Sequence, residues 1–333
     1  MRLARIWASD STALFTLAVS NIILVFAMDK MNVLYTFDTK FWRMAAVSID
    51  SLMRNHSHPN SVTIYCMVAP HTRGRAKISQ IVQSYGGELV WRPIRNFKNP
   101  FRRHTFRRWS PVIYYRLFAH RIFPDLDRIL YLDSDTLVLG DLTELYQTDI
   151  SKHTMAAVCD MAPINITPIA SGRYVQNFIK TYLKHNLYVN SGVLLINLKQ
   201  MSRYDDAFQN ADIPLQYPDQ DLINYCLDGD ILRLPLRYNF TTSIDGASPY
   251  ITHAEYADAQ SNTMIYHFYA IKPYIYHLTP RNIYQMFTSA AQQIGFYPPD
   301  FYSSKKRHHN RRTGIFGLRL HRGKTLRFFG IKI

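Results

Sequence analysis

The sequence predicts an α/β fold built around a parallel central sheet. Strand-like runs alternate with helical segments from residue 32 onward, an order typical of βαβ units. The chain has 333 residues, 47% of them hydrophobic, which is enough for one large core with appendages. Asp133 and Asp135 follow an apolar run at 129–132, the kind of strand end where α/β proteins collect ligands. A ligand-binding α/β domain is therefore the first expectation.

The individual elements follow from hydrophobic periodicity. The first strand, at 32–37, ends before Asp38, and Ala45, Ile49 and Leu52 then share one face of a helix. Further strands are expected at 62–68, 88–91, 129–132, 156–159 and 191–197. Further helical segments are expected at 76–85, 113–122, 174–184 and 220–227. The stretch 100–111, rich in arginine and aromatic residues, is too long for an ordinary connection and is expected to be a functional loop.

The N-terminal segment leaves several interpretations open. Residues 12–28 carry no charge and follow Arg2 and Arg5. A transmembrane helix needs about 20 such residues, so the segment is at the lower limit. A membrane anchor, a signal peptide, an interfacial helix and an upstream start codon all fit. We expect three regions: an apolar extension or anchor at 1–30, a catalytic domain at 31–280, and a helical, basic membrane-attachment tail at 281–333.

The net charge of +15 is concentrated in two places. Residues 301–333 hold ten Lys and Arg and no acid, which leaves 15 − 10 = +5 for the rest of the chain. The mixture of cations and apolar residues in this tail favours an anionic membrane surface, with disorder or nucleic-acid contact as the alternatives. Residues 92–108 hold seven Lys and Arg and no acid, which favours an anionic acceptor over a merely solvated loop.

Cysteine usage excludes two classes of protein. Cys66, Cys159 and Cys226 are odd in number and far apart, and none lies in a CxxC or Cys/His spacing. Neither a disulfide framework nor a zinc site is therefore expected. A reducing compartment is the natural setting for such a chain.

The sharpest chemical signal is Asp133-Ser134-Asp135. Two carboxylates two residues apart can face one hard cation that bridges a diphosphate. Taken alone, they could equally be solvated aspartates in a turn. A phosphatase of the DxDx[TV] type is a weaker alternative, because Leu137 stands at the Thr/Val position.

Three further constellations follow downstream. Asn190-Ser191-Gly192 precedes an apolar strand, Asp219-Gln220-Asp221 opens a helix, and His267 is followed by Lys272 and Pro273. Each has an ordinary structural explanation, such as helix capping for the carboxylates. Their combination is what carries information.

Taken together, LYLDSDTLVLGDLTELY, NSGVLLINL, YPDQDLIN and HFYAIKPY resemble the retaining glycosyltransferases of family 8. This family includes bacterial lipopolysaccharide galactosyl- and glucosyltransferases and glycogenin. The resemblance covers residues 32–277. It implies a GT-A fold: a single Rossmann-like nucleotide-sugar-binding domain with a mixed central sheet, here followed by the basic C-terminal tail.

The resemblance also implies roles for particular residues. Asp133, Asp135 and His267 are the expected Mn²⁺ ligands, with Mg²⁺ as the alternative ion. Lys272 would contact the donor diphosphate, and Asp38 and Thr36 the uridine. Arg116 would reach the donor sugar. The remaining substrate positions are Ser134, Asn190, Ser191 and Gly192, and the catalytic positions are Asp160, Asp219 and Gln220.

The expected reaction is hexose transfer with retention. A cation and Lys272 would stabilise the charge of the leaving nucleoside diphosphate where it develops. Attack from the same face as the leaving group is favoured over a nucleophilic Asp219, with Gln220 polar toward the sugar. One departure from the family pattern stands out: HxxGxxKP is HFYAIKP here, one residue shorter and with Ala270 in place of glycine.

The overall expectation is therefore an enzyme. It would transfer galactose or glucose from a UDP-sugar to an anionic saccharide or glycolipid, with no nucleic-acid partner. It would lie on the cytoplasmic face of the cell membrane, peripherally or by an N-terminal anchor. The alternative is an inactive relative that binds anionic polysaccharide or nucleic acid.

Overall fold

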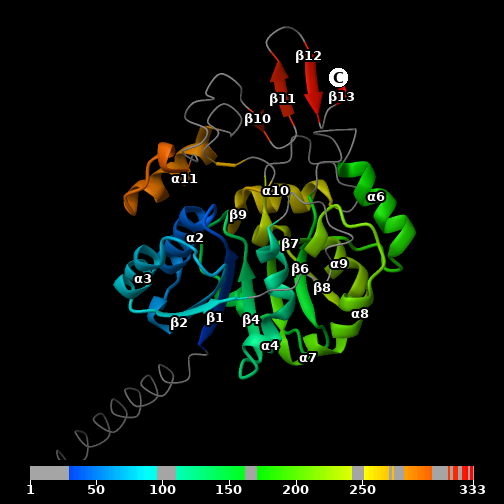
Figure 1. Cartoon of the computed structure of the whole chain (residues 1–333), viewed down its shortest axis with the longest axis horizontal. Coiled ribbons are helices and arrows are strands. Elements are labelled where there is room, and N and C mark those ends of the chain that lie inside the picture. Colours follow the sequence, from blue (N-terminus) through cyan, green and yellow to red (C-terminus); the bar gives the residue numbers. More distant parts are fainter. Residues whose placement is uncertain are drawn as a thin grey trace, which may run out of the picture.

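A seven-stranded sheet with helices on both faces forms the centre of the molecule (Figure 1). The computed structural model describes residues 30–95, 110–161, 171–241, 251–269, 272–273 and 281–301, and four short strands between 314 and 332. Within these residues, no helix is long and apolar enough to cross a membrane. The N-terminal segment 1–29, with its expected anchor, lies outside the described residues.

The strand order is β3-β2-β1-β4-β7-β6-β8. The strands are β1 (Met31–Phe37), β2 (Val62–Val68), β3 (Glu88–Pro93), β4 (Arg128–Leu132), β6 (Met155–Cys159), β7 (Val189–Asn197) and β8 (Ile231–Leu234). The first four are parallel, and β6 pairs in parallel with β8. Only β7 is reversed, because it pairs antiparallel with both β4 and β6. The six strands read from periodicity are all present, whereas β8 was missed. The alternation of strands and helices indicated parallel pairing, and the reversed β7 confirms the mixed central sheet that the family resemblance implies.

Alternate residues of the strands feed two hydrophobic layers, one on each face. Leu130 and Leu132 of β4 belong to one layer, while Ile129 and Tyr131 belong to the other. The first layer is covered by α2 (Trp42–Asn55), α3 (Arg75–Ser84) and α11 (Arg281–Gln293). The second is covered by η2 (Pro111–Phe118), α6 (Ser171–Tyr182), α8 (Asp205–Asn210) and α9 (Pro218–Cys226).

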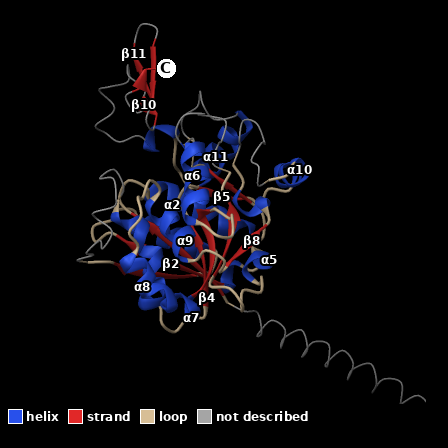
Figure 2. Ribbon diagram, turned by 90° about the vertical axis from the view of Figure 1, so that its right-hand side faces the viewer, coloured by secondary structure: helices blue, strands red, loops and turns tan. Residues whose placement is uncertain are grey.

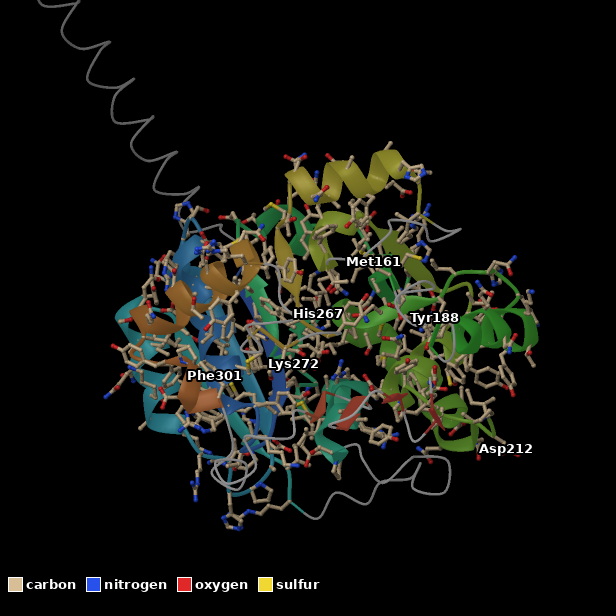
Figure 3. All side chains as sticks on the ribbon, turned by 90° about the horizontal axis from the view of Figure 1, so that it is seen from above. Met161, Tyr188, Asp212, His267, Lys272 and Phe301 are labelled. Carbon is tan, nitrogen blue, oxygen red and sulfur yellow. The ribbon has the colours of Figure 1, made fainter. Side chains whose placement is uncertain are left out.

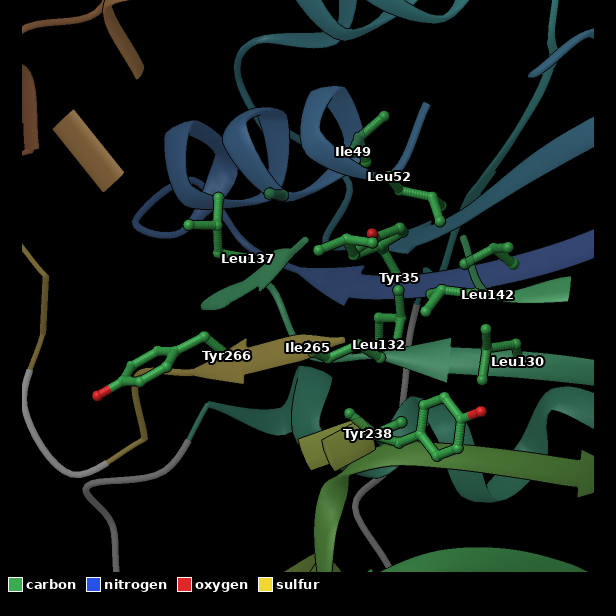
Figure 4. Packing of buried hydrophobic residues seen from close by; sticks show 14 of the residues in the cluster. Tyr35, Ile49, Leu52, Leu130, Leu132, Leu137, Leu142, Tyr238, Ile265 and Tyr266 are labelled. Carbon is green, nitrogen blue, oxygen red and sulfur yellow. The ribbon is translucent and has the colours of Figure 1, made fainter. Parts of the chain in front are cut away.

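Helix α2 shows how the sequence pattern becomes packing. Ala45, Ile49 and Leu52, predicted to share one face, are all fully buried against the sheet. Figure 4 shows Ile49 and Leu52 lying over Tyr35 of β1. Burying a side chain of the size of Ile or Leu contributes about 1.5–3 kcal/mol to folding.

The helical segment that precedes β4 differs from the prediction in the type of helix. The expected α-helix at 113–122 is a 3₁₀ helix, η2, followed by one α-turn, α4 (Ala119–Ile122). Pro111 opens η2, which suits the first helical position. Most of the η2 side chains are buried, so packing on several sides outweighs the α-helical preference of the sequence.

A small second sheet sits beyond the end of β4. β5 (Thr136–Val138) pairs antiparallel with β9 (Ile265–His267), with Thr136 opposite His267. Figure 4 shows Leu137 and Ile265, one from each strand, among the packed side chains of the hydrophobic core. β5 has too few residues for a periodic signal, whereas the apolar residues before His267 do indicate the strand that β9 forms. The pairing brings His267 to the turn that carries Asp135.

The region after residue 280 has two parts. Helix α11 packs on the main body, with Phe287 beside Phe268 at 5.5 Å between ring centroids. Beyond it lies a separate antiparallel sheet of β10 (Gly314–Ile315), β11 (Leu318–His321), β12 (Thr325–Phe328) and β13 (Ile331–Lys332) (Figure 2). The division of the chain at residues 30 and 280 stays a prediction.

Candidate functional site

The site begins where β4 ends. The backbone N–H of Asp133 donates to Gly192 O at 2.8 Å, which continues the ladder with β7 by one residue. The chain then turns, because Thr136 donates to Asp133 O through both its backbone N–H (3.2 Å) and its hydroxyl (2.9 Å). This tight turn presents Asp133, Ser134 and Asp135 at the carboxyl edge of the sheet, beyond the C-terminal ends of its parallel strands.

Three side chains converge at this edge. Asp133, Asp135 and His267 each offer one ligand atom, and these atoms lie within 4.8 Å of one another. His267 Nε2 is 3.3 Å from Asp135 Oδ1 and 3.6 Å from Asp133 Oδ2. The imidazole is 1% exposed while the Asp133 side chain is 25% exposed. The cluster is therefore rooted in the core and opens toward solvent through Asp133.

Lys272 lies against the same cluster. Its ammonium forms an ion pair with Asp135 Oδ2 and also donates to Phe268 O at 3.2 Å. Burial raises the pKa of Asp135, but the interactions with Lys272 and His267 outweigh it and hold that pKa below its ordinary value. Figure 3 shows His267 and Lys272 side by side when the molecule is viewed from above.

Arg116 of η2 is the buried cation behind the cluster. Its guanidinium donates to Asp133 Oδ1 at 2.9 Å and to Ser191 O at 2.6 Å, and lies 3.3 Å from Asp219 Oδ2. Its Cζ also stacks on the Tyr131 ring, 4.0 Å from the centroid. Although burial lowers the pKa of Arg116, the neighbouring acids raise it above its usual value, so it is a permanent cation that ties β4, β7 and α9 together.

Tyr131, which was not singled out from the sequence, links the cluster of Asp133, Asp135 and His267 to β1. Its hydroxyl donates to Asp133 Oδ1 at 2.5 Å and lies 3.1 Å from Thr36 Oγ1. Asp38, at the carboxyl end of β1, accepts from the backbone N–H of Lys40 at 2.8 Å. Ser134 donates a long hydrogen bond, 3.5 Å, to Thr36 O. The expected uridine residues thus lie at the strand end adjacent to Asp133.

The predicted sugar-side residues are joined by side-chain amides. Gln220 Oε1 accepts from Ser191 N at 3.1 Å and from Asn190 Nδ2 at 3.2 Å. Gln220 Nε2 donates to Asp160 Oδ2 at 2.7 Å. These polar residues are all buried. β7, α9 and the end of β6 therefore meet in one hydrogen-bonded group.

Asp219 and Gly192 have roles that geometry makes specific. Burial raises the pKa of Asp219, and the Arg116 charge only partly opposes it. Gly192 lies directly against the imidazole: a Cβ built on it would be 2.0 Å from His267 Cε1. Gly192, expected to contact substrate, is thus positioned to leave room for the His267 ring.

Asp221 is a buried carboxylate that no sequence pattern distinguishes from Asp219. It accepts from Tyr188 at 2.5 Å, from Tyr174 at 2.8 Å and from the backbone N–H groups of Gln216 and Tyr217. It thereby fixes α6 and the start of α9 against β7. Burial raises the pKa of Asp221 to about 7 despite these four donors.

Some expected features fall outside the described residues. These are most of the basic stretch 92–108, of which only 92–95 are described, and Ala270 in the shortened loop.

The chain is similar in sequence to known glycosyltransferases. The sequence profile of glycosyl transferase family 8 matches residues 32–276. Lipopolysaccharide 1,2-glucosyltransferase of Escherichia coli K12 is 28% identical over 254 residues, which span 73% of this chain and 72% of that protein. Glycosyltransferase GlyE of Streptococcus pneumoniae is 24% identical over 236 residues, 67% of this chain and 51% of GlyE. The chain thus spans about half the length of GlyE.

Among solved structures, the galactosyltransferase LgtC in complex with donor and acceptor sugar analogues superposes with a TM-score of 0.63. The identity is 23%, and the match covers 84% of this chain and 99% of LgtC. An active-site mutant of LgtC gives a TM-score of 0.64 at 24% identity, covering 83% of this chain and 99% of that one. At this level of identity the likeness shows a shared fold.

Proposed function

The chain belongs to glycosyl transferase family 8 and has an α/β fold of the GT-A type, and from this we propose that it is a retaining hexosyltransferase. It would transfer galactose or glucose from a UDP-sugar to a saccharide or glycolipid, with Mn²⁺ as the bound cation. The observation that carries the proposal is the convergence of Asp133, Asp135 and His267 at the carboxyl end of β4.

The chemistry of this cluster fits a divalent cation. Two carboxylates and one imidazole supply oxygen and nitrogen donors from three directions, and their spacing within 4.8 Å allows one ion to contact all three. Mg²⁺ is the alternative ion, since it also accepts carboxylate ligands. When bound, the cation would neutralise charge that accumulates on the departing diphosphate.

The chain's own residues would do the rest of the binding. Lys272, already beside Asp135, is placed to contact a diphosphate at the same point. Asp38 and Thr36, at the end of the neighbouring strand β1, would hold the uridine. Arg116 keeps Asp133 oriented through a 2.9 Å hydrogen bond, so the carboxylate that faces solvent does not swing away.

Retention requires either a nucleophilic side chain or attack from the face of the leaving group. We favour same-face attack. Gln220 is a poor nucleophile and its amide is hydrogen-bonded at both ends. Asp219 is paired with the Arg116 guanidinium at 3.3 Å, which draws electron density from its carboxylate and makes it a weaker nucleophile. A covalent glycosyl adduct trapped on Asp219 would overturn this preference.

The C-terminal region supports attachment to an anionic membrane at the cytoplasmic face. Residues 301–333 carry ten Lys and Arg and no acid, interspersed with apolar residues such as Leu318, Leu320 and Phe328. A segment that combines cations with apolar residues suits anionic lipid.

Removal of residues 302–333 tests this attachment. The shortened chain should stay in solution when anionic vesicles are pelleted, whereas the full chain should pellet with them. Pelleting of the shortened chain would exclude the tail as the attachment site. The basic stretch 92–108, with seven Lys and Arg and no acid, favours an anionic saccharide or glycolipid as the acceptor class.

The experiment that tests the enzymatic proposal is release of UDP from a panel of UDP-sugars. We expect release from one donor with Mn²⁺, none with EDTA, and none from the Asp135→Ala variant. Binding of a UDP-sugar without release under any of these conditions would favour the alternative, an inactive relative that binds anionic polysaccharide.

A further inference from the structure

We propose that Asn239 is a positioning residue for the cation site, which fixes the orientation and tautomer of His267. The proposal rests on the function proposed above, because it assigns His267 as a cation ligand. Asn239 is the last residue of η4 (Leu236–Asn239) and is 2% exposed. Its Oδ1 lies 2.8 Å from His267 Nδ1, on the side of the ring away from Asp133 and Asp135.

The direction of this hydrogen bond follows from a backbone group. The N–H of Gly192 can only donate, and it points at Asn190 Oδ1 at 2.9 Å. That atom of Asn190 is therefore an oxygen, and the atom of Asn239 that faces it at 2.9 Å must be the Nδ2 donor. Asn239 consequently turns its Oδ1 toward the imidazole, and the hydrogen of their bond must belong to His267 Nδ1.

The hydrogen bond to Asn239 holds His267 in the orientation and tautomer in which Nε2 can bind a cation. With Nδ1 carrying a hydrogen, the neutral ring has its lone pair on Nε2, the atom that faces Asp135 at 3.3 Å and Asp133 at 3.6 Å. Partners of this kind raise the affinity of a histidine ligand by holding its ring and tautomer in place.

The two residues are also held together through the backbone. His267 N–H donates to Phe240 O at 2.8 Å, and Phe240 N–H donates to Ile265 O at 2.9 Å. The residue after Asn239 is thus bonded on both sides to β9, the strand that carries His267. The contact between Asn239 and the imidazole is built into the fold rather than made by two mobile side chains.

The same chain of amides reaches the sugar side of the site. Asn190 donates to Gln220, and Gln220 donates to Asp160, so four side-chain hydrogen bonds run from His267 to Asp160. Their directions are fixed at two points by the N–H groups of Gly192 and Ser191. Asn239 is therefore one member of a hydrogen-bonded chain that connects the cation ligand to the sugar side, while the Ser191 N–H holds Gln220 in its orientation.

The test compares Mn²⁺ affinity of full-length variants by electron paramagnetic resonance titration in the presence of UDP. Asn239→Ala removes the acceptor for His267 Nδ1–H and should weaken Mn²⁺ binding by about 10- to 100-fold. Asn239→Asp keeps an acceptor and should bind Mn²⁺ more tightly than Asn239→Ala. The matched control is Asn197→Ala, which removes a half-buried asparagine that caps a helix at the far end of β7.

The outcomes separate this proposal from the enzymatic one. Wild-type affinity in Asn239→Ala, with His267→Ala impaired, would overturn the role of Asn239 alone. Equal weakening in Asn239→Ala and Asn197→Ala would also overturn it, because the loss would then be structural. Absence of Mn²⁺ binding in the wild type would overturn both.

A second measurement does not depend on the variant folding. Nitrogen-15 NMR of histidine-labelled wild-type protein reports which ring nitrogen carries the hydrogen, and His267→Ala identifies the signal. We expect a hydrogen on Nδ1 of His267. A neutral ring with the hydrogen on Nε2 instead would overturn the proposal.

Discussion

Asp135 and Lys272 form a direct ion pair at the centre of the site, between residues 137 positions apart in the sequence. Each is expected to bind a different part of the substrate complex: Asp135 the cation and Lys272 the diphosphate. Their contact shows that both groups reach the same point. A bound cation would therefore compete with the ammonium for Asp135, and the Lys272 ammonium would then meet the phosphate oxygens at the same point.

Asp135→Asn should lower the turnover number by on the order of 10²-fold or more, because the amide cannot replace the negative charge beside the cation. The measurement is UDP release at saturating donor. Asp127→Asn is the matched control, since Asp127 precedes β4 at its opposite end and is paired only with exposed Lys199. Equal turnover of Asp135→Asn and the wild type would contradict the cation role.

Lys272→Ala should raise the KM for the UDP-sugar by about 10- to 100-fold, the range given by loss of one charge-assisted hydrogen bond of 1.5–3 kcal/mol. Initial rates across donor concentrations give this value. Lys199→Ala, whose side chain is 68% exposed, serves as the control. An unchanged KM in Lys272→Ala would reject contact with the diphosphate.

Gly192→Ala should weaken the binding of the cation while the chain still folds. The added Cβ would lie 2.0 Å from His267 Cε1, so the imidazole must move away from Asp135. We expect a clear loss of Mn²⁺ affinity, measured by titration, in a protein that still unfolds cooperatively. Retained affinity would mean that the backbone of β7 shifts instead of the ring.

Arg116→Ala should lower the free energy of unfolding by about 3–5 kcal/mol, because it leaves buried carboxylates without their cation. Arg116 is 4% exposed and contacts Asp133, Asp219 and Ser191 O. Urea unfolding measures the change. Arg121→Ala, whose side chain is 44% exposed and pairs with Asp205, should cost less than about 1 kcal/mol. Similar losses in both variants would contradict the special role of Arg116.

Asp221 should make the protein less stable as pH rises from 5 to 7. Its pKa is raised to about 7 in the folded chain, so the folded state holds a proton that the unfolded state has lost. The free energy of unfolding should fall by roughly 2 kcal/mol over this interval because of this group. Asp221→Asn should lack that part of the decrease. Parallel pH curves for the two proteins would show that Asp221 is ionised in both states.

The fold could be predicted from the sequence where the hydrophobic pattern extends over many residues. The buried face of α2 and the six strands of the first prediction are present because their apolar residues repeat over enough positions to be read. The direction of β7 could not be read, since a strand buried on both faces has the same apolar composition whichever way it runs. β8, with Arg233 in a four-residue strand, and the three-residue strand β5 carry too little hydrophobic pattern to be read from the sequence.

Only the site residues that belong to sequence motifs could be predicted. Asp133 and Asp135 are two residues apart in the sequence, and the resemblance to family 8 gave roles to His267 and Lys272. Tyr131 and Asn239 were missed because their roles depend on hydrogen bonds formed in the folded chain. Asn239 lies 28 positions before His267, and no local spacing connects them.

The placement of His267 on β9 also has a consequence for how the protein opens. β9 has three residues, and His267 meets Asp135 across 132 positions of sequence. If β9 detaches locally, the cluster loses its imidazole, so cation release and local unfolding of this strand are thermodynamically linked. Cation bound to the native chain would accordingly slow amide hydrogen exchange in β5 and β9 more than in the central sheet, because the ion would hold these two short strands together.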